Sequence, residues 1–417
     1  MVFKYAYPTL LQSANLINSN SWFDIKIRKN NKYKQKNNKI KLNNSLLSTI
    51  KIKLFLNDNQ KKLINQWMND IIDVYNLTNE FIKQEFKKNK DYKIINFFSL
   101  RMTLKDKINK ICKKNNLNKH TADYSVKHCV EMYKSALSNH KTFNKFDIKN
   151  LLKNRRRKNL IIEPNSISKK HHSIFYRNLR NINSSIPLDI ISKNSILQYD
   201  SYKKTYIIIS PYEYNKKEEL KREEKCGIDI GCRTFLTTYS PKESLEIGCN
   251  AIDQIDKYNK KLDSIKKTKS YYKNLNRRLR IKFKKLENKY SDKLSNKIND
   301  MHNKACNYLL RHYETIIIGK VSTKSMVSNL KGNIEKITKR RLLGLKHYRF
   351  RMKLLSMSKK YDCKIKLINE YMTSKTCSEC GSINKNLGSN KIYKCINKSC
   401  LLKIDRDINA AINIYNK

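Results

Sequence analysis

The chain has 417 residues, which is long enough to build two or three hydrophobic cores. Lysine and arginine together number 90 against 35 aspartates and glutamates, which gives a formal net charge of +55. A charge of this size repels itself unless a long polyanion neutralises it, so it favours DNA or RNA as a partner over a small phosphate ligand.

An AT-rich genome would account for part of the lysine excess, because Lys, Asn and Ile are all abundant, but it explains the scarcity of acids less readily. The chain has no run of about 18 consecutive apolar residues and no signal-peptide pattern, so we expect an intracellular protein without a membrane span. Structural disulfides are not expected in such a reducing compartment.

The first 47 residues are polar and basic, with a run of Lys and Asn around 29–43. This composition predicts a disordered arm, which is either a plain extension or an added RNA-binding tail.

A strand followed by helices is predicted after this arm. Residues 48–55 alternate like a strand, and Asn57 can cap a helix that carries Trp67 and Tyr75 on one apolar face. Helical periodicity then continues to about residue 140.

From about residue 141 to 215 the pattern becomes strand-like, with its clearest strand at 205–210 and another at 187–191. The basic run Lys153–Lys158 lies in this region. Its three arginines are candidates for phosphate contacts, and the alternative is a solvated run of charge. These arginines are Arg155, Arg156 and Arg157.

The second half of the chain predicts strands, then a helical hairpin, then strands that alternate with helices. The order is typical of an RNase H-like α/β layer. The expected strands are 226–230, 235–239, 244–248, 315–319 and 364–370, and the expected helices are two long ones within 252–308, one near 338–360 and a final one after 405.

Four of the eleven cysteines form two pairs near the C-terminus. Cys377 and Cys380 enclose two residues, Cys395 and Cys400 enclose four, and 14 residues separate the pairs. Four thiolates suit one tetrahedral zinc ion in a closed, structural site. The alternative is two chance pairs of free cysteines, and in a reducing compartment the spacing favours zinc.

Three acids stand out on either side of this cluster. Asp229 lies in the otherwise apolar strand CGIDI, where a buried carboxylate is costly unless it is paired or holds a metal. Asp405 and Asp407 lie at the start of the final helix, where an acid is also a common cap. Either feature alone is weak evidence for catalysis.

The runs GIDIGCRTF, TSKTCSECG, the second cysteine pair and DRDINAAINI occur in a fixed order that resembles the C-terminal half of the TnpB/Fanzor family. TnpB proteins accompany bacterial insertion sequences, Fanzors are their eukaryotic and giant-virus relatives, and type V CRISPR effectors are further kin. The resemblance is strong over about 200–417, looser over 48–200, and absent from the first 47 residues. The composition also fits a giant-virus copy.

The resemblance implies RNA-guided cleavage of double-stranded DNA by a RuvC-type site, in which three acids hold two magnesium ions about 4 Å apart. Asp229 matches the first acid. Asp407 matches the third, with Asp405 as the nearby alternative.

The second acid departs from the common pattern, because most TnpB sequences have Glu where this chain has Gly319. Taken alone, this predicts an inactive nuclease. Glu370, however, ends the strand expected beside 315–319, and neighbouring strands lie only about 4.8 Å apart. The resemblance implies a relocated glutamate of the kind that Fanzors use, so we expect Glu370 to reach the same metals. The alternative is a surface residue at a strand end.

Three cations, Arg233, Lys375 and Arg406, are near these acids in sequence. They either hold the scissile phosphate or balance the acids. The expected partners are a guide RNA from the protein's own element and double-stranded target DNA, with a recombinase encoded by the element as a further candidate. The expected compartment is the nucleus or a viral factory.

The function expected from the resemblance is a magnesium-dependent, RNA-guided DNA endonuclease of a transposable element, involved in transposition or DNA recombination. The alternatives are a catalytically dead RNA-guided DNA-binding regulator and a guide-free transposase. The expected fold is an RNase H-like (RuvC) core with an inserted helical hairpin and a zinc ribbon, preceded by a β-barrel-like wedge domain with a helical recognition insertion.

The domains expected on this basis are the arm at 1–47, the wedge at 48–56 and 141–215, the recognition domain at 57–140, the nuclease core at 216–370, the zinc ribbon at 371–402 and the final core segment at 403–417.

Overall fold

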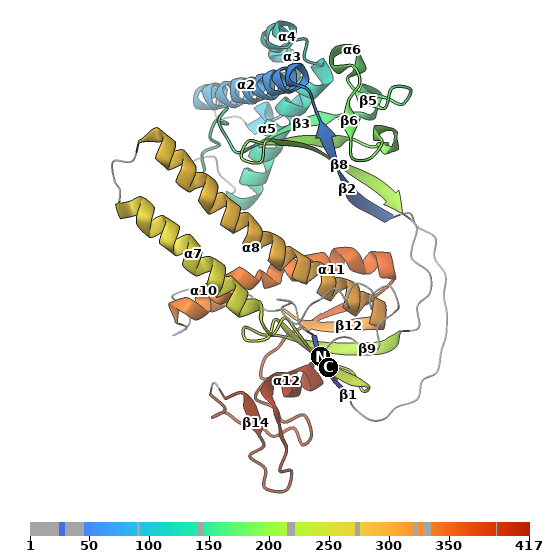
Figure 1. The fold of residues 1–417 in the computed structure, drawn as a ribbon, viewed down its shortest axis with the longest axis vertical. Coiled ribbons are helices and arrows are strands. Elements are labelled where there is room, and N and C mark those ends of the chain that lie inside the picture. The colour runs from blue at the N-terminus through green and yellow to red at the C-terminus, as the bar shows by residue number, and fades with distance from the viewer. Residues whose placement is uncertain are drawn as a thin grey trace. The chain divides into compact units, whose positions relative to one another are not determined.

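The structure is a computed structural model that describes residues 25–29, 46–89, 92–140, 146–214, 222–271, 276–320, 323–327, 335–388 and 390–417. The chain forms two compact units (Figure 1). The insert unit is Leu47–Tyr214, and the terminal unit combines Met1–Leu46 with Asn215–Lys417.

The insert unit begins with β2 (Leu46–Phe55) and the long helix α2 (Asp58–Asn89), as expected. Asn57 caps this helix: its side-chain oxygen accepts a hydrogen bond of 2.9 Å from the Gln60 amide, and the Gln60 side chain accepts one of 2.9 Å from the Asn57 amide. This reciprocal pair satisfies two amides that a helix start would leave unpaired. The apolar face of α2 is buried through Trp67 and Tyr75.

The other helices of the insert unit pack with a five-stranded sheet of order β3-β7-β8-β2-β6 around one hydrophobic core. The segments predicted to form separate wedge and recognition domains therefore share one core. The remaining helices are α3 (Phe97–Thr103), α4 (Lys105–Lys114), α5 (Lys119–His140) and α6 (Tyr176–Leu179), with short 3-10 turns η1 (Tyr92–Ile94) and η3 (Pro164–Ser166). The remaining strands are β3 (Arg157–Ile162), β4 (Ile167–Ser168), β5 (Ser173–Ile174), β6 (Asn183–Ser184), β7 (Ser195–Asp200) and β8 (Thr205–Tyr214).

The strand predicted at 187–191 is wrong, because this segment forms a 3-10 turn, η4 (Leu188–Ile190). Pro187 has no amide to donate to a strand ladder. Leu188 and Ile191, three positions apart, are both buried, which suits a helical turn better than an alternating strand.

The terminal unit contains a six-stranded sheet of order β1-β11-β10-β9-β12-β13. Strands β9, β12 and β13 are parallel to one another, and the others pair antiparallel. The strands are β1 (Ile25–Lys29), β9 (Glu223–Ile230), β10 (Leu236–Tyr239), β11 (Glu243–Ile247), β12 (Tyr313–Gly319) and β13 (Lys364–Ile368).

Helices cover both faces of this sheet, with α12 opposite α8 and α11 (Figure 1). The side chains of Cys226, Ile228, Ile316 and Ile318 share a core with α7, α8, α10 and α11. The helices are α7 (Ala251–Tyr271), α8 (Arg277–His312), α9 (Thr323–Val327), α10 (Lys336–Leu345), α11 (His347–Tyr361) and α12 (Arg406–Tyr415).

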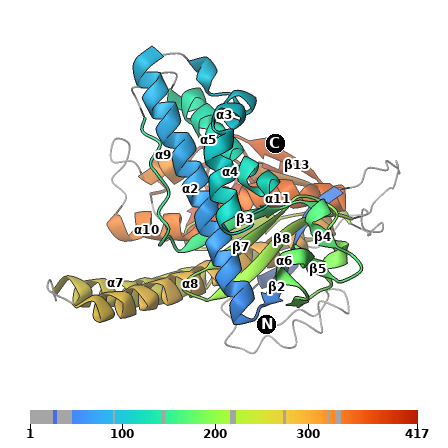
Figure 2. The same ribbon diagram turned by 90° about the horizontal axis from the view of Figure 1, so that it is seen from above.

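The predicted hairpin of two long helices is confirmed, since α7 and α8 run side by side in both views (Figure 2). The single helix predicted near 338–360 is instead two, α10 and α11. Lys346 separates them with a left-handed backbone (φ 55°), which a continuous helix cannot contain.

The arm predicted to be disordered contains one strand. β1 adds antiparallel to β11, with Ile25 opposite Ile247 and Lys29 opposite Glu243, so the prediction is wrong for these five residues. The edge of a sheet offers unpaired backbone groups that recruit such a strand. The rest of the arm before β2 lies outside the described residues. None of the described helices is long and apolar enough to cross a membrane.

Candidate acid cluster and metal centre

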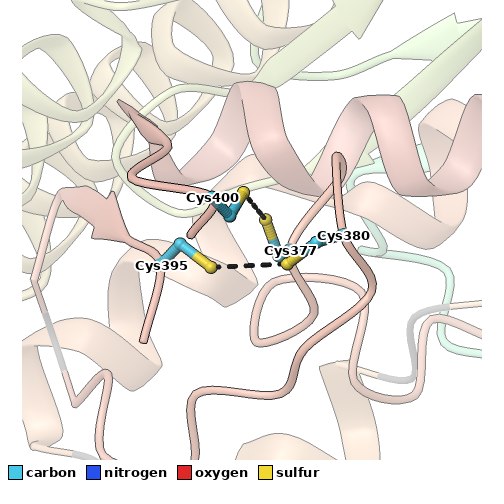
Figure 3. A group of neighbouring side chains, drawn as sticks. All are labelled: Cys377, Cys380, Cys395 and Cys400. Carbon is cyan, nitrogen blue, oxygen red and sulfur yellow. Dashed lines mark hydrogen bonds between the residues drawn. The ribbon is translucent and has the colours of Figure 1, made fainter. Parts of the chain in front are cut away.

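The four paired cysteines come together in space, as the sequence predicts (Figure 3). The Sγ atoms of Cys377 and Cys400 are 3.7 Å apart, and those of Cys380 and Cys395 are 3.5 Å apart. All four lie within 4.8 Å of one another, the one such group of possible metal ligands among the described residues. Hydrogen bonds from Ser382 lower the pKa of the Cys380 thiol to about 6, which favours the metal-binding thiolate. The cluster can therefore hold a zinc ion.

Two tight turns bring the cysteines together. In the first turn the Gly381 amide donates to the Cys377 carbonyl at 3.1 Å, and Gly381 has a positive φ of 75° that other residues rarely adopt. The second pair flanks the turn after β14 (Ile392–Lys394), which pairs antiparallel with β15 (Lys403–Asp405). Leu387 and Tyr393 are the other buried apolar residues of this small core, so metal binding would supply much of its stability.

Asp229 lies near the C-terminal end of β9, at the edge where three parallel strands end together. Ile228 pairs with Ile318 across β9 and β12, so Asp229 is level with Gly319. Side chains alternate along a strand, so Asp229 shares a face with Gly227. A Cβ at Gly227 would lie 2.4 Å from the Ala411 carbonyl, which shows that α12 packs directly against this face.

The N-terminus of α12 distinguishes its two acids. The Asp405 carboxylate accepts hydrogen bonds from the amides of Asp407 (2.9 Å) and Ile408 (3.4 Å) and therefore caps the helix. Asp407 lies one turn before Ala411, on the helix face that packs over β9. The geometry thus favours Asp407 as the acid that faces Asp229, with Asp405 as a cap.

The Glu370 side chain lies in the space above Gly319. A Cβ on Gly319 would be 1.4 Å from Glu370 Oε1 and 1.8 Å from its carboxyl carbon. The Glu370 Oε1 atom is buried and has no hydrogen-bond partner among the described residues. An unpaired buried carboxylate oxygen is costly, and a divalent cation at this position would satisfy it. The donor set therefore fits magnesium.

The three carboxylates repel one another. Burial, followed by the charges of Asp407 and Glu370, raises the pKa of Asp229 well above its ordinary value. Burial and the neighbouring Asp405 raise the pKa of Asp407, and burial raises that of Glu370 to about 7. Clustered acids with raised pKa values are typical of a site that becomes fully charged when a cation binds.

Two of the three cations predicted near the acids are there. Arg233 and Arg406 act electrostatically to lower the pKa of Asp407, against the larger effect of burial. Lys375 instead donates to the Lys385 carbonyl at 3.2 Å, beside the cysteine cluster.

Sequence reasoning missed two cations that favour the charged form of Glu370, Arg351 and Lys417. Arg351 also donates to the Gly319 carbonyl at 3.4 Å, and the Lys417 ammonium donates to the Asn369 carbonyl at 3.1 Å. Arg351 lies in α11 and Lys417 follows α12. Neither residue belongs to a sequence motif that would have identified it.

The basic run in the insert unit is partly neutralised. Asp200 is nearly buried and lies within 3.2 Å of the Arg156 guanidinium and 3.5 Å of that of Arg157. Arg155 is exposed. Arg157 is exposed as well, so Arg155 is the exposed arginine of the three that lies outside the ion pairs with Asp200.

Comparison with known proteins identifies the class of protein. The family model described as "Probable transposase" matches residues 209–330, and the one described as "Cas12f1-like, TNB domain" matches 347–414. A TnpB-like protein of Acanthamoeba polyphaga mimivirus is 34% identical over 385 residues, covering 88% of this chain and 72% of the relative. This chain belongs to the family of TnpB-like proteins.

A second protein of the same virus, described as a transposase, is 29% identical and covers 96% of this chain and 88% of the relative. Among solved structures, the Cas12f1–sgRNA–target DNA complex matches with 16% identity and a TM-score of 0.33, covering 89% of this chain and 99% of that chain. The mini-RNA-guided endonuclease Cas_phi3 matches with 13% identity and a TM-score of 0.34, covering 55% of this chain and 52% of that chain.

Proposed function

We propose that this protein is an RNA-guided, magnesium-dependent DNA endonuclease of a transposable element, with an RNase H-like (RuvC-type) core in the terminal unit. The observation that carries the proposal is the Glu370 side chain in the space above Gly319. It supplies the acid that the sequence of β12 lacks, on the sheet face that also carries Asp229 and faces α12.

In this proposal Asp229, Glu370 and Asp407 hold two magnesium ions. Bound there, the ions would supply charge neutralisation at the scissile phosphate and a water of lowered pKa. Among the described residues, only the four thiols bring three or more ligand atoms within 4.8 Å of one another. The three acids are therefore spaced more widely than the thiols.

The protein's own cations have separate roles in the proposal. Arg233 and Arg406 lie beside Asp407 and orient the scissile phosphate, while Arg351 and Lys417 favour the ionised form of Glu370 against the larger effect of burial. The cysteine cluster is structural, because four thiolates leave no open coordination position. Arg155 contacts a phosphate of the guide RNA.

The proposed partners are a guide RNA from the element itself and a matched DNA duplex. Membership of the TnpB-like family and the net charge of +55 support both. Cooperation with a recombinase of the element, and residence in a nucleus or viral factory, stay predictions.

The test begins with the RNA that co-purifies with the protein, which is sequenced to define the guide. The complex is then incubated with a matched duplex library in magnesium, beside the variants Asp229→Ala, Glu370→Ala and Asp407→Ala. Asp405→Asn is the matched control, because it removes a carboxylate on the same turn and keeps a capping side chain. Cutting by the wild type and the control, lost in the three variants, is expected.

Other outcomes identify the alternatives. Guide-dependent binding without cutting would make the protein a DNA-binding regulator. Cutting or strand exchange that needs no guide would make it a transposase in the stricter sense. Activity that survives in Glu370→Ala would remove the relocated glutamate from the proposal.

A further inference from the structure

Two asparagines of α12 face away from Asp407 and towards the segment that carries Cys377. Asn409 and Asn413 are four residues apart, so they form one stripe along the helix. Asn409 is fully buried. Neither residue has a place in the proposed nuclease chemistry, and a buried amide must have hydrogen-bond partners to be tolerated.

Asn409 forms hydrogen bonds to the backbone on both sides of Cys377. Its side-chain nitrogen donates to the Thr376 carbonyl at 2.7 Å, and its side-chain oxygen accepts from the Ser378 amide at 3.0 Å. These two backbone groups flank Cys377. A single side chain thus fixes the backbone that presents this thiol, as a neighbouring strand would.

Asn413 extends the same contact towards Glu370. Its side-chain nitrogen lies 2.7 Å from the Thr376 carbonyl and 2.8 Å from the Thr373 carbonyl. Thr373 in turn donates to the Glu370 carbonyl from its hydroxyl at 2.9 Å and from its amide at 3.2 Å. The turn that carries Glu370 is therefore tied to the same helix.

The opposite face of α12 packs on β9 through Ala411 and carries Asp407. One helix therefore contacts the acid-bearing sheet on one side and the segment from Glu370 to Ser378 on the other. Anything that orders Cys377 also orders this segment, since the hydrogen bonds are short and the segment has only nine residues.

We propose that Asn409 and Asn413 are positioning residues that couple the cysteine cluster to the acid cluster, so that zinc held by the four cysteines fixes the placement of Asp407 and Glu370. The zinc site then controls the geometry of the nuclease site without taking part in its chemistry. The coupling itself requires only that the cysteines hold a metal, and the roles of the two acids rest on the proposed function.

The coupling predicts reciprocal effects, because two linked equilibria must influence each other equally. In the full-length protein loaded with zinc, Asn409→Ala removes two hydrogen bonds at Cys377 and should speed zinc release to a chelator by roughly tenfold to a hundredfold. Asn409→Asp keeps the acceptor for Ser378 but places a buried carboxylate against the Thr376 carbonyl, so it should also speed zinc release. Asn416→Ala, at an exposed position at the end of the same helix, is the matched control and should release zinc at the wild-type rate.

Amide hydrogen exchange measures the other direction. Removing zinc from the wild type should speed exchange of the α12 amides, whereas in Asn409→Ala and Asn413→Ala the exchange of α12 should change much less on zinc removal. Zinc release at the wild-type rate from Asn409→Ala would overturn the proposal. An unchanged rate of α12 amide exchange when zinc is removed from the wild type would overturn it as well. If Asn409→Ala does not fold, Asn409→Asp and Asn413→Ala decide the question with the same two measurements.

Neither measurement uses RNA or DNA, so the coupling can fail while the nuclease proposal stands, and the reverse. A cleavage assay then separates positioning from binding. With guide and target, Asn409→Ala should lower the cleavage rate and leave target affinity near that of the wild type. Target affinity that falls in step with the cleavage rate would contradict a positioning role.

Discussion

The carboxyl group of Glu370 occupies the space that a side chain on Gly319 would need, with Oε1 1.4 Å from the position of a Cβ at residue 319. Gly319 ends β12 and pairs with Ile368, the last residue of the parallel strand β13, and Glu370 follows Ile368 by two residues. Glu370 can therefore occupy this position only because residue 319 on β12 has no side chain.

Gly319→Ala should abolish metal-dependent cleavage while Glu370 is still present in the sequence. The new methyl group would displace the end of a flexible side chain, so the fold should survive with a small loss of stability. The double variant Gly319→Glu with Glu370→Gly should restore cutting, because it returns the acid to β12. Lys320→Ala, at the exposed neighbouring position, is the control; full activity in Gly319→Ala would contradict the relationship.

Gly227→Ala should destabilise the fold. Here the added Cβ would meet backbone atoms, 2.4 Å from the Ala411 carbonyl and 2.5 Å from the Tyr415 amide, and backbone cannot rotate away. We expect a loss of about 1–3 kcal/mol in the free energy of unfolding. Chemical denaturation measures it, and a variant as stable as the wild type would show that α12 does not rest on β9.

Asp405 and Asp407 should differ in what they affect. Asp405→Ala removes a helix cap and should lower the free energy of unfolding by about 0.5–2 kcal/mol, while Asp407→Asn removes a buried charge and should leave stability unchanged or higher. Cleavage should be lost in Asp407→Asn and kept in Asp405→Asn. Thermal melts and a cleavage assay read the two effects, and the opposite pattern would exchange the two roles.

The stabilising effect of magnesium should grow with pH. Burial raises the pKa of Glu370 from 4.5 to about 7, so the folded state binds a proton between these values that the unfolded state has released. Without metal, this carboxyl favours folding below about pH 4.5 and loses that contribution as pH rises through about 7. Magnesium binds the ionised form.

The rise in melting temperature caused by magnesium should therefore be larger at pH 8 than at pH 6, and the difference should shrink in Glu370→Gln. Equal shifts at both pH values in the wild type would contradict a role for this carboxyl in metal binding.

Neighbouring arginines in the insert unit should separate into structural and RNA-binding roles. Arg156→Ala leaves the nearly buried Asp200 without the closer of its two arginine partners and should lower the free energy of unfolding by about 1–2 kcal/mol. Arg155→Ala should leave stability unchanged, weaken RNA binding and reduce the salt dependence of affinity by about one phosphate contact. RNA titrations at several salt concentrations measure this change in affinity. Wild-type affinity in Arg155→Ala would mean that this arginine is a solvated surface charge and does not contact RNA.

The sequence predicts well what depends on local pattern. The strands that carry Asp229 and Gly319, the helical hairpin and the four cysteines follow from alternation, helical spacing and ligand spacing, and the structure contains all of them. The choice between Asp405 and Asp407 needed the observed hydrogen bonds, because both acids suit a helix start.

Tertiary contacts that no local pattern encodes were beyond sequence reasoning. Ile25–Lys29 become a strand because a sheet edge is available, and Lys346 breaks a helix whose periodicity looks continuous. Arg351 and Lys417 meet Glu370 only because α11 and the end of the chain lie beside it. Lys375 was expected near the acids on its position in sequence, yet it faces the cysteine segment.

The order of the three acids along the chain has a consequence for biosynthesis. Asp229 follows the insert unit, Glu370 precedes the cysteine segment, and Asp407 comes from α12, the last described helix. Domains made early in translation fold first, so the insert unit can form while the acid cluster is still incomplete. On the proposed function, a nascent or prematurely ended chain that lacks α12 would also lack Asp407, so only finished molecules would be able to cut DNA.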